Sequence, residues 1–179
     1  MDEAEERLIS ELRSGSTQAF DAVYARYRVP VFTFLFRLAG NRQLADDLFQ
    51  NTWLKLARAA PRLRPDTNLQ AWLFSVARNE HRSHRRWHRM DVRRLLAAET
   101  EVTVAKGEQP QEQRNALRTA ERALAHVSSS DRELLLLVAV EGLELQATAR
   151  ILGVSYPALR QRLARARAQL AALMKELER

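Results

Sequence analysis

Cysteine is absent from the chain, and glycine and proline are scarce, with five residues of each among 179. The lack of cysteine excludes disulfide bonds, thiolate metal sites and cysteine nucleophiles, and it fits a protein of the reducing cytoplasm. So little glycine and proline leaves few residues for the turns of a hairpin-rich sheet protein. Alanine, leucine, arginine, glutamine and glutamate are abundant instead, and they favour helix. We therefore expect an all-α fold.

Long apolar runs are also missing. The longest apolar stretches, residues 31–36 and 134–140, are much shorter than the ~20 residues that a membrane-spanning helix needs. The N-terminal sequence MDEAEERLIS is acidic, whereas the start of a signal peptide is basic. These absences predict a soluble, cytoplasmic protein with no membrane insertion.

Basic residues outnumber acidic ones by 29 to 22, for a formal net charge of +7 at pH 7. The lysines are only Lys55, Lys106 and Lys175, so nearly all of the positive charge is guanidinium. Such a balance favours a polyanionic partner. A biased genome would produce the same excess of arginine, so the placement of the arginines along the chain has to decide.

Apolar spacing and capping residues predict four helices in the first half of the chain. They cover residues 3–13, 17–39, 42–60 and 69–90. Gly40 closes the second helix, and Asn41 and Asn68 cap the third and fourth. Pro30 must kink or break the second helix. Residues 61–68 are expected to form a loop after Pro61 stops the third helix.

A linker is predicted between about residues 91 and 113, because periodicity weakens there and Gly107 and Pro110 stand among charged and β-branched residues. The chain thus divides into two small helical domains, residues 1–90 and 114–179. In the second domain, Ser130 and Glu133 predict a capping box at the start of the helix that contains the apolar residues 134–140.

Residues 145–167, LQATARILGVSYPALRQRLARAR, combine a short helix, a turn with Gly153 and a longer basic helix. This is the plan of a helix-turn-helix, although a generic αα-hairpin has the same outline. The expected buried stripe of the long helix consists of Leu159, Leu163, Ala166, Leu170, Leu173 and Leu177. The opposite face offers small residues and long donors suited to a DNA groove: Ala158, Gln161, Ala164, Arg165 and Ala168, flanked by Arg160 and Arg162. A merely solvated face is the alternative, but no acidic residue occurs between Gln146 and Lys175.

The end of the fourth helix, NEHRSHRRWHR, contains three of the four histidines. Helical spacing predicts a basic stripe, suited to single-stranded or duplex DNA, that includes Trp72, Asn79, Arg82, Arg86 and Arg89. Trp87 falls on the packed side, and His81, His84 and His88 fall on the other flank. The order Glu-His-x-x-His with no third ligand argues against a metal, so we expect neither a metal nor a cofactor. The histidines then lie near phosphates, a partner or water.

Features of an enzyme are missing. There is no glycine-rich phosphate loop, and Asp46 and Asp47 point about 100° apart on their helix, which is poor geometry for shared acid–base or two-metal chemistry. We therefore expect a protein without catalytic activity.

The quoted segments, together with FDAVYARY, ADDLFQNTWLKL and AWLFSVARNEHRSHRR, resemble the small two-domain sigma factors of bacterial RNA polymerase, the extracytoplasmic-function type of the sigma-70 family. The resemblance covers roughly residues 17–89 and 115–172, in the family's order and spacing. The combination is far more specific than either half, because isolated motifs are weak signals.

This resemblance implies a subunit that binds core polymerase and directs it to promoters. It implies that the clamp helices of the β′ subunit are bound by Asp46, Asp47, Gln50, Trp53 and Leu54. It implies a minus-ten site made of Arg62, Arg64, Asn68, Trp72, Asn79, Arg82, Arg86 and Arg89. It implies a minus-thirty-five site made of Ser155, Tyr156, Ala158, Arg160, Gln161, Arg162 and Arg165, with residues 134–140 in the part that holds the β flap.

Two questions of partnership stay open at this point. Members of the family are often held by an anti-sigma factor, although nothing in the sequence shows such a partner. An autonomous helix-turn-helix regulator is the alternative function, and it predicts tight duplex binding by the free protein. A sigma factor instead binds duplex DNA weakly until it has joined core polymerase.

Overall fold

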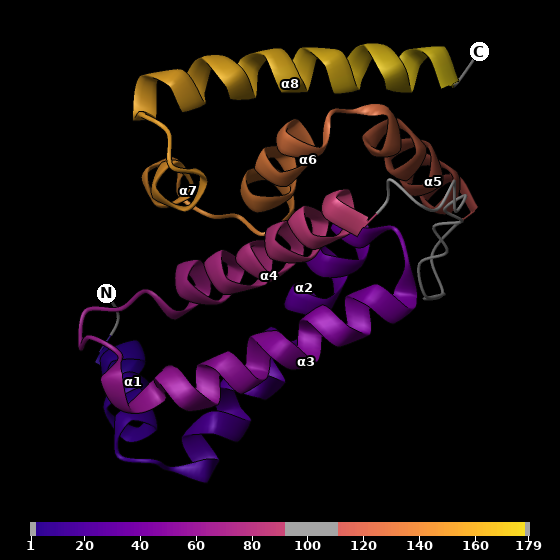
Figure 1. The fold of residues 1–179 in the computed structure, drawn as a ribbon. Helices are drawn as coiled ribbons and strands as arrows, with labels where there is room; N and C mark the ends of the chain where they lie inside the picture. The colour runs from indigo at the N-terminus through magenta and orange to yellow at the C-terminus, as the bar shows by residue number, and fades with distance from the viewer. Residues whose placement is uncertain (1–2, 92–110, 178–179) are drawn as a thin grey trace. The chain divides into compact units, whose positions relative to one another are not determined.

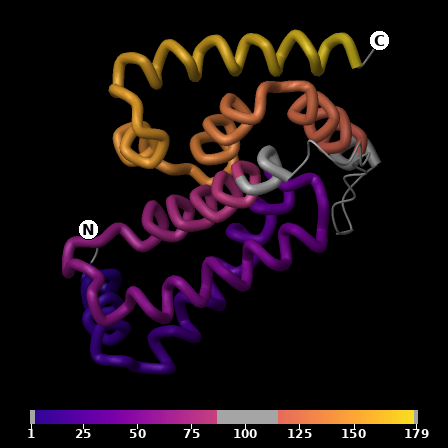
Figure 2. Tube along the Cα trace, viewed as in Figure 1, coloured from indigo at the N-terminus to yellow at the C-terminus, as the bar shows by residue number. Residues whose placement is uncertain are grey.

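The computed structural model describes residues 3–91 and 111–177, and within these ranges all regular structure is helical (Figure 1). The chain divides into two compact units, residues 1–100 and 101–179 (Figure 2). The predicted all-α fold in two helical parts is therefore confirmed. The limits predicted for the two domains and for the linker 91–113 stay predictions, because residues 92–110 lie outside the described ranges.

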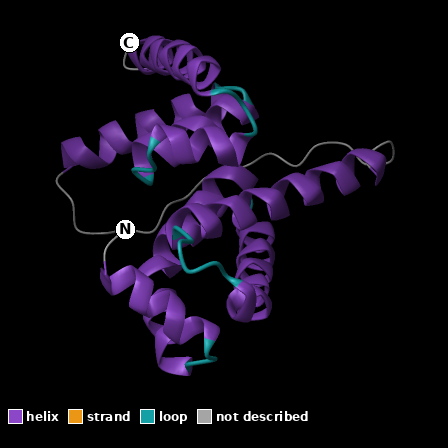
Figure 3. Ribbon diagram, turned by 90° about the vertical axis from the view of Figure 1, so that its left-hand side faces the viewer, coloured by secondary structure: helices purple, strands orange, loops and turns teal. Residues whose placement is uncertain are grey.

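Short loops join the helices of the first unit (Figure 3). Its elements are α1 (Glu3–Arg13), α2 (Thr17–Ala39), α3 (Arg42–Ala59), the 3-10 turn η1 (Ala60–Arg62) and α4 (Leu69–Asp91). The third helix thus ends one residue earlier than predicted, and Pro61 lies inside the 3-10 turn that follows it. Helix α2 continues through Pro30, so this proline does not break it.

Local signals fix the ends of these helices. The side chain of Ser16 accepts a hydrogen bond from the Ala19 amide at the start of α2, and Asn41 does the same for Leu44 at the start of α3. Gly40 ends α2 with a φ of 65°, in the left-handed region that glycine adopts at little cost.

The core of the first unit lies where α2, α3 and α4 pack on one another. Phe34 of α2 meets Phe74 of α4 edge to face, with ring centroids 5.2 Å apart, and both rings are fully buried. Val23 and Leu35 of α2 and Leu56 of α3 are also completely buried. Helix α4 is therefore held along its apolar side, which leaves its other side to the solvent.

The second unit contains α5 (Gln111–His126), α6 (Ser129–Leu135), the π-helical turn η2 (Leu136–Val140), α7 (Leu145–Leu152) and α8 (Tyr156–Leu177). Helix α8 packs on α5, α6 and α7. Its predicted stripe is buried at Leu159, Leu163 and Ala166 and partly exposed at Leu170, Leu173 and Leu177. A turn at residues 141–142 follows η2, with Gly142 at a φ of 66°.

The predicted capping box at Ser130 and Glu133 is wrong by two residues. Helix α6 is capped by Ser128, whose Oγ accepts from the Asp131 amide at 3.2 Å and donates to Asp131 Oδ2 at 2.8 Å. Three consecutive serines precede Asp131, so the sequence offers more than one capping serine. Asp131 lies three residues after Ser128, and it takes the place that Glu133 would take after Ser130. Glu133 is instead buried.

Among the described residues, no helix is long and apolar enough to cross a membrane.

Candidate nucleic-acid interface

The segment between α3 and α4 presents two exposed arginines, Arg62 at the end of η1 and Arg64 in the loop that follows. Arg64 donates from Nε and Nη2 to the two carboxylate oxygens of Asp66, at 2.9 and 3.0 Å. The hydrogen bond from Arg64 holds the pKa of Asp66 below its ordinary value. Because both side chains are highly exposed, the pair is weak, and a phosphate can replace Asp66 at the guanidinium.

Two side chains from different parts of the chain hold the first turn of α4. Asn68 Oδ1 accepts from the Ala71 amide at 2.7 Å, which confirms Asn68 as the predicted cap. Glu5 of α1 reaches across the unit, and its Oε1 accepts from the Leu69 amide at 3.2 Å. The oxygen of Asn68 is therefore engaged in the helix cap, and α1 fixes the point where the loop enters α4.

The predicted basic stripe lies on the exposed side of α4. Asn79, Arg82 and Arg86 are exposed, and Trp72 is partly buried. Leu73 and Ala77, on the packed side, are fully buried. The side chain of Arg89 lies outside the described side chains. This face therefore offers an amide and two guanidinium groups in successive turns, as a phosphate or base contact requires.

The histidines of α4 do not form a common solvated flank, so that expectation is wrong for His81. Its side chain is only 3% exposed, and it follows Leu73 and Ala77 at four-residue intervals on the packed side. Arg78, three residues before His81, is also buried. His84 is partly exposed, and the side chains of His88 and Trp87 lie outside those described. Among the described residues, no three potential ligands come together to hold a metal ion.

The α3 residues predicted to bind polymerase are not equally available. Asp47, Gln50 and Leu54 are exposed and share one face at positions i, i+3 and i+7, with Leu54 54% exposed. Asp46 is partly exposed and lies 3.9 Å from Arg42 Nε. Trp53 is 6% exposed.

Trp53 belongs to an aromatic cluster that holds α2 against α3. Its ring centroid lies 4.8 Å from that of Tyr24, 5.8 Å from Phe49 and 6.1 Å from Phe20. Such edge contacts stabilise the packing of the two helices. Trp53 therefore supports the exposed face of α3 from behind and is not presented on it.

The helix-turn-helix of the second unit forms as predicted. Gly153 ends α7 with a φ of 69°, and Ser155 Oγ accepts from the Ala158 amide at 3.4 Å at the start of α8. Ala149 of α7 and Leu159 of α8 are buried. The residues that are exposed on α8 and its cap include Ser155, Tyr156, Ala158, Arg160, Gln161 and Arg165.

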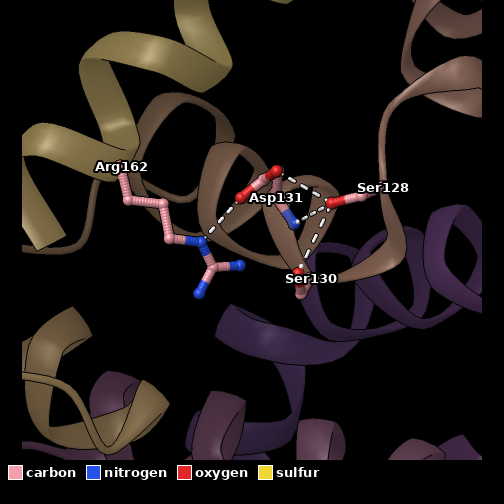
Figure 4. A network of polar contacts seen from close by, with 4 residues as sticks. All are labelled: Ser128, Ser130, Asp131 and Arg162. Atoms are coloured by element: carbon pink, nitrogen blue, oxygen red, sulfur yellow. Dashed lines mark hydrogen bonds and ion pairs between the residues drawn. The ribbon is translucent and has the colours of Figure 1, made fainter.

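Arg162 differs from the other arginines predicted at this surface. Its Nε donates to Asp131 Oδ1 at 2.6 Å, and the two side chains are 24% and 25% exposed (Figure 4). Burial acts to raise the pKa of Asp131, but hydrogen bonds from Arg162 and Ser128 and the charges of Arg162 and Arg165 outweigh it, so this pKa lies below its ordinary value. Helical spacing predicted that Arg162 flanks the face of α8 suited to a DNA groove, but it gave no sign of the acidic partner on α6.

The apolar segment 134–140, expected to hold the polymerase flap, is mostly inside the second unit. Leu134 and Leu137 are fully buried, whereas Val140 is 48% exposed. The Glu141 amide donates to the Leu136 carbonyl five residues back, which makes this turn π-helical. Only the end of the segment is thus available to a partner.

Comparison with known proteins agrees with this arrangement. The family model for sigma-70 region 2 matches residues 23–89, and the model for sigma-70 region 4 matches residues 117–170. The RNA polymerase sigma factor CarQ of Myxococcus xanthus is 31% identical over 170 residues, covering 95% of this chain and 97% of CarQ. The ECF RNA polymerase sigma factor EcfG of Rhodopseudomonas palustris is 33% identical over 141 residues, covering 79% and 77%.

A solved structure of the sigma factor RpoE in complex with the anti-sigma factor NepR, from Bartonella quintana, matches with a TM-score of 0.78 and 25% identity. The match covers 89% of this chain and 98% of RpoE. The family is non-enzymatic and binds RNA polymerase and promoter DNA, in agreement with the expectation from the sequence. The chain belongs to the extracytoplasmic-function type of the sigma-70 family, and it is an RNA polymerase sigma factor with a region 2 and a region 4 for promoter recognition.

Proposed function

We propose that the two units divide promoter recognition between them. The first unit reads and opens the minus-ten element, and the second reads the minus-thirty-five element. The observation that carries this proposal is that each matched region presents one exposed helix face with arginine and amide side chains. These are Asn79, Arg82 and Arg86 on α4, and Gln161 and Arg165 on α8. Arginine and amide groups serve both base edges and phosphates.

Core polymerase, in this proposal, is bound by the exposed α3 face of Asp47, Gln50 and Leu54, which docks on the clamp helices of the β′ subunit. An exposed leucine flanked by polar groups is a suitable centre for a protein interface. The end of the η2 turn, at Val140, binds the β flap. Such a complex forms in the cytoplasm, where polymerase and chromosomal DNA meet.

The test is transcription by purified core polymerase with and without this protein on fragmented genomic DNA, with the transcript starts mapped. We expect new starts that share two upstream elements and appear only when both components are present. An autonomous regulator would instead bind duplex DNA tightly by itself, and core polymerase would gain no new starts. That result would contradict the division of labour proposed above.

Two substitutions separate the roles of the units. If Arg165 reads a base, Arg165→Ala weakens binding to promoters that carry that upstream base pair by about 1–3 kcal/mol. If Arg165 holds only phosphate, the substitution weakens binding to all sequences evenly. Asn79→Ala slows promoter opening, measured with a fluorescent base in the minus-ten element, and leaves polymerase binding intact. Asn115→Ala, an exposed amide on α5, is the matched control. If Asn79→Ala abolishes polymerase binding, the assignment of α4 is wrong.

We also propose that an anti-sigma factor holds this chain, as NepR holds RpoE in the similar structure. The support is the similarity of the fold over 89% of this chain. Such a partner would co-purify with the protein and would inhibit the transcription assay in proportion to its concentration. A co-purifying protein that leaves transcription unchanged would contradict the proposal.

A further inference from the structure

The charge of Arg162 is directed into the second unit and not toward its surface. Arg160 and Arg165, close to it on α8, are exposed. Only 24% of the Arg162 side chain is exposed, and its Nη2 atom is buried without a hydrogen-bond acceptor in the part of the chain that the structure describes. A guanidinium that donates to an internal carboxylate through Nε and buries one of its two terminal nitrogens is turned away from a DNA phosphate.

The partner of Arg162 is itself held in place. Asp131 lies in the first turn of α6, and Ser128 both donates to its carboxylate and accepts from its amide (Figure 4). The carboxylate therefore has little freedom, because its second oxygen is already engaged. A fixed acceptor of this kind fixes the orientation of the arginine that donates to it.

The next residue fastens the same turn to α5. Arg132 donates from Nε to the Leu124 carbonyl at 2.8 Å, and from Nη2 to the carbonyls of Ala125 at 2.6 Å and Val127 at 3.3 Å. The turn between α5 and α6 is thus bonded backward to α5 and, through Asp131, across to α8. A polar connection from this turn to α8 runs through the carboxylate of Asp131.

We propose that Arg162 is a positioning residue that fixes α8 on α6 through Asp131, and that it makes no contact with DNA. The pair sets the angle at which α8 presents Gln161 and Arg165, so discrimination of the upstream element depends on Asp131, an acidic residue on another helix. The inference rests on the proposed function, in which α8 reads promoter DNA.

The experiment is a double-mutant cycle with Asp131→Asn and Arg162→Gln in holoenzyme formed from core polymerase and the full chain. The measured quantity is the ratio of binding to a promoter with an intact upstream element over one with that element scrambled, taken across a salt series. Each single variant lowers this ratio about tenfold, and the double variant lowers it no further, because both remove the same interaction. The salt dependence stays unchanged, since no phosphate contact is lost.

A charge swap, Asp131→Arg with Arg162→Asp, is the rescue test. It restores an ion pair and part of the discrimination, whereas either reversal alone does not. Arg167→Gln, the same type of substitution at an exposed position of α8, is the matched control and leaves the ratio unchanged. Thermal unfolding of each variant, followed by circular dichroism, identifies any that fail to fold, and these are replaced by the conservative Arg162→Lys and Asp131→Glu.

The proposal is overturned if Arg162→Gln reduces the salt slope by about one and Asp131→Asn leaves the ratio intact, since Arg162 then holds a phosphate. It is also overturned if the two effects add. If the unsubstituted holoenzyme shows no preference for the intact upstream element, and Arg165→Ala changes nothing, the proposed function of α8 is itself wrong. That result differs from the first two, so the two failures are distinguishable.

Discussion

Removal of the Glu5 carboxylate tests how α1 supports the surface proposed to read the minus-ten element. The Leu69 amide lies at the start of α4, where amides have no acceptor within the helix. It donates to Glu5 Oε1 at 3.2 Å, and Glu5 is partly buried. A net hydrogen bond to a charged group contributes about 1.5–3 kcal/mol, and the long distance and partial exposure favour the lower end. We therefore expect Glu5→Ala to lower the free energy of unfolding of the first unit by about 1.5 kcal/mol.

Glu5→Gln should cost less than Glu5→Ala. The amide oxygen still accepts from Leu69, so the loss is confined to the interaction of the charge with the N-terminal end of the α4 dipole, about 0.5 kcal/mol. The order of the variants is then wild type, Glu5→Gln and Glu5→Ala. A helix dipole effect alone would make the two substitutions equal.

Tryptophan fluorescence during urea titration is the assay, because Trp53, Trp72 and Trp87 all lie within residues 1–100 and report on the first unit alone. Glu6→Ala, at the exposed neighbouring position, is the control and should change the unfolding free energy by less than about 0.5 kcal/mol. In holoenzyme, Glu5→Ala should slow promoter opening more than it weakens polymerase binding. Equal effects of the Glu5→Ala and Glu6→Ala substitutions would refute the reasoning.

Two further predictions concern stability. Phe34→Ala removes a fully buried ring and its edge contact with Phe74, so it should destabilise the first unit by about 3–5 kcal/mol. The same fluorescence titration measures this loss, and a value below about 1 kcal/mol would show that the core collapses around the site. The pKa of Asp131 is lower in the folded state than the unfolded value of about 3.9, so its contribution is complete above that pH and is lost as the pH falls through the folded pKa. Urea unfolding followed by circular dichroism should therefore show that the difference between wild type and Asp131→Asn narrows from about pH 4 downward, whereas a difference that is constant with pH would contradict an ionised pair.

Local signals in the sequence were sufficient for the helices and for most of their ends. The caps at Asn41, Asn68 and Ser155 and the glycine that ends α7 all lie within a few residues of the groups they satisfy. Helical spacing also separated the buried and exposed faces of α8, because the face of each residue follows from its position alone. These features depend only on residues that are close together in the sequence, so the sequence alone is enough to predict them.

Partners distant in sequence could not be predicted in the same way. Arg162 and Asp131 are 31 residues apart, and Glu5 and Leu69 are 64 apart. Spacing placed Arg162 beside the reading face but contained no information on which side chain of another helix it would meet. Trp53 shows the same limit, since its burial depends on three rings from α2 and α3. His81 is different, because its four-residue spacing from Leu73 and Ala77 was available in the sequence.

In both units, a carboxylate from another element holds the helix that carries the exposed basic face. A helix that reads DNA needs an exposed basic face, and the faces proposed for α4 and α8 are exposed among the described residues. In the first unit, the carboxylate of Glu5 binds the end of α4, and in the second, the carboxylate of Asp131 binds the side of α8. Each acid comes from an element earlier in the chain than the helix it bonds to. Because both acids are partly buried, salt screens them less than it screens contacts between exposed arginines and phosphate. The geometry of each reading helix should therefore persist at salt concentrations that already weaken its hold on DNA, so that salt reduces affinity before it reduces discrimination.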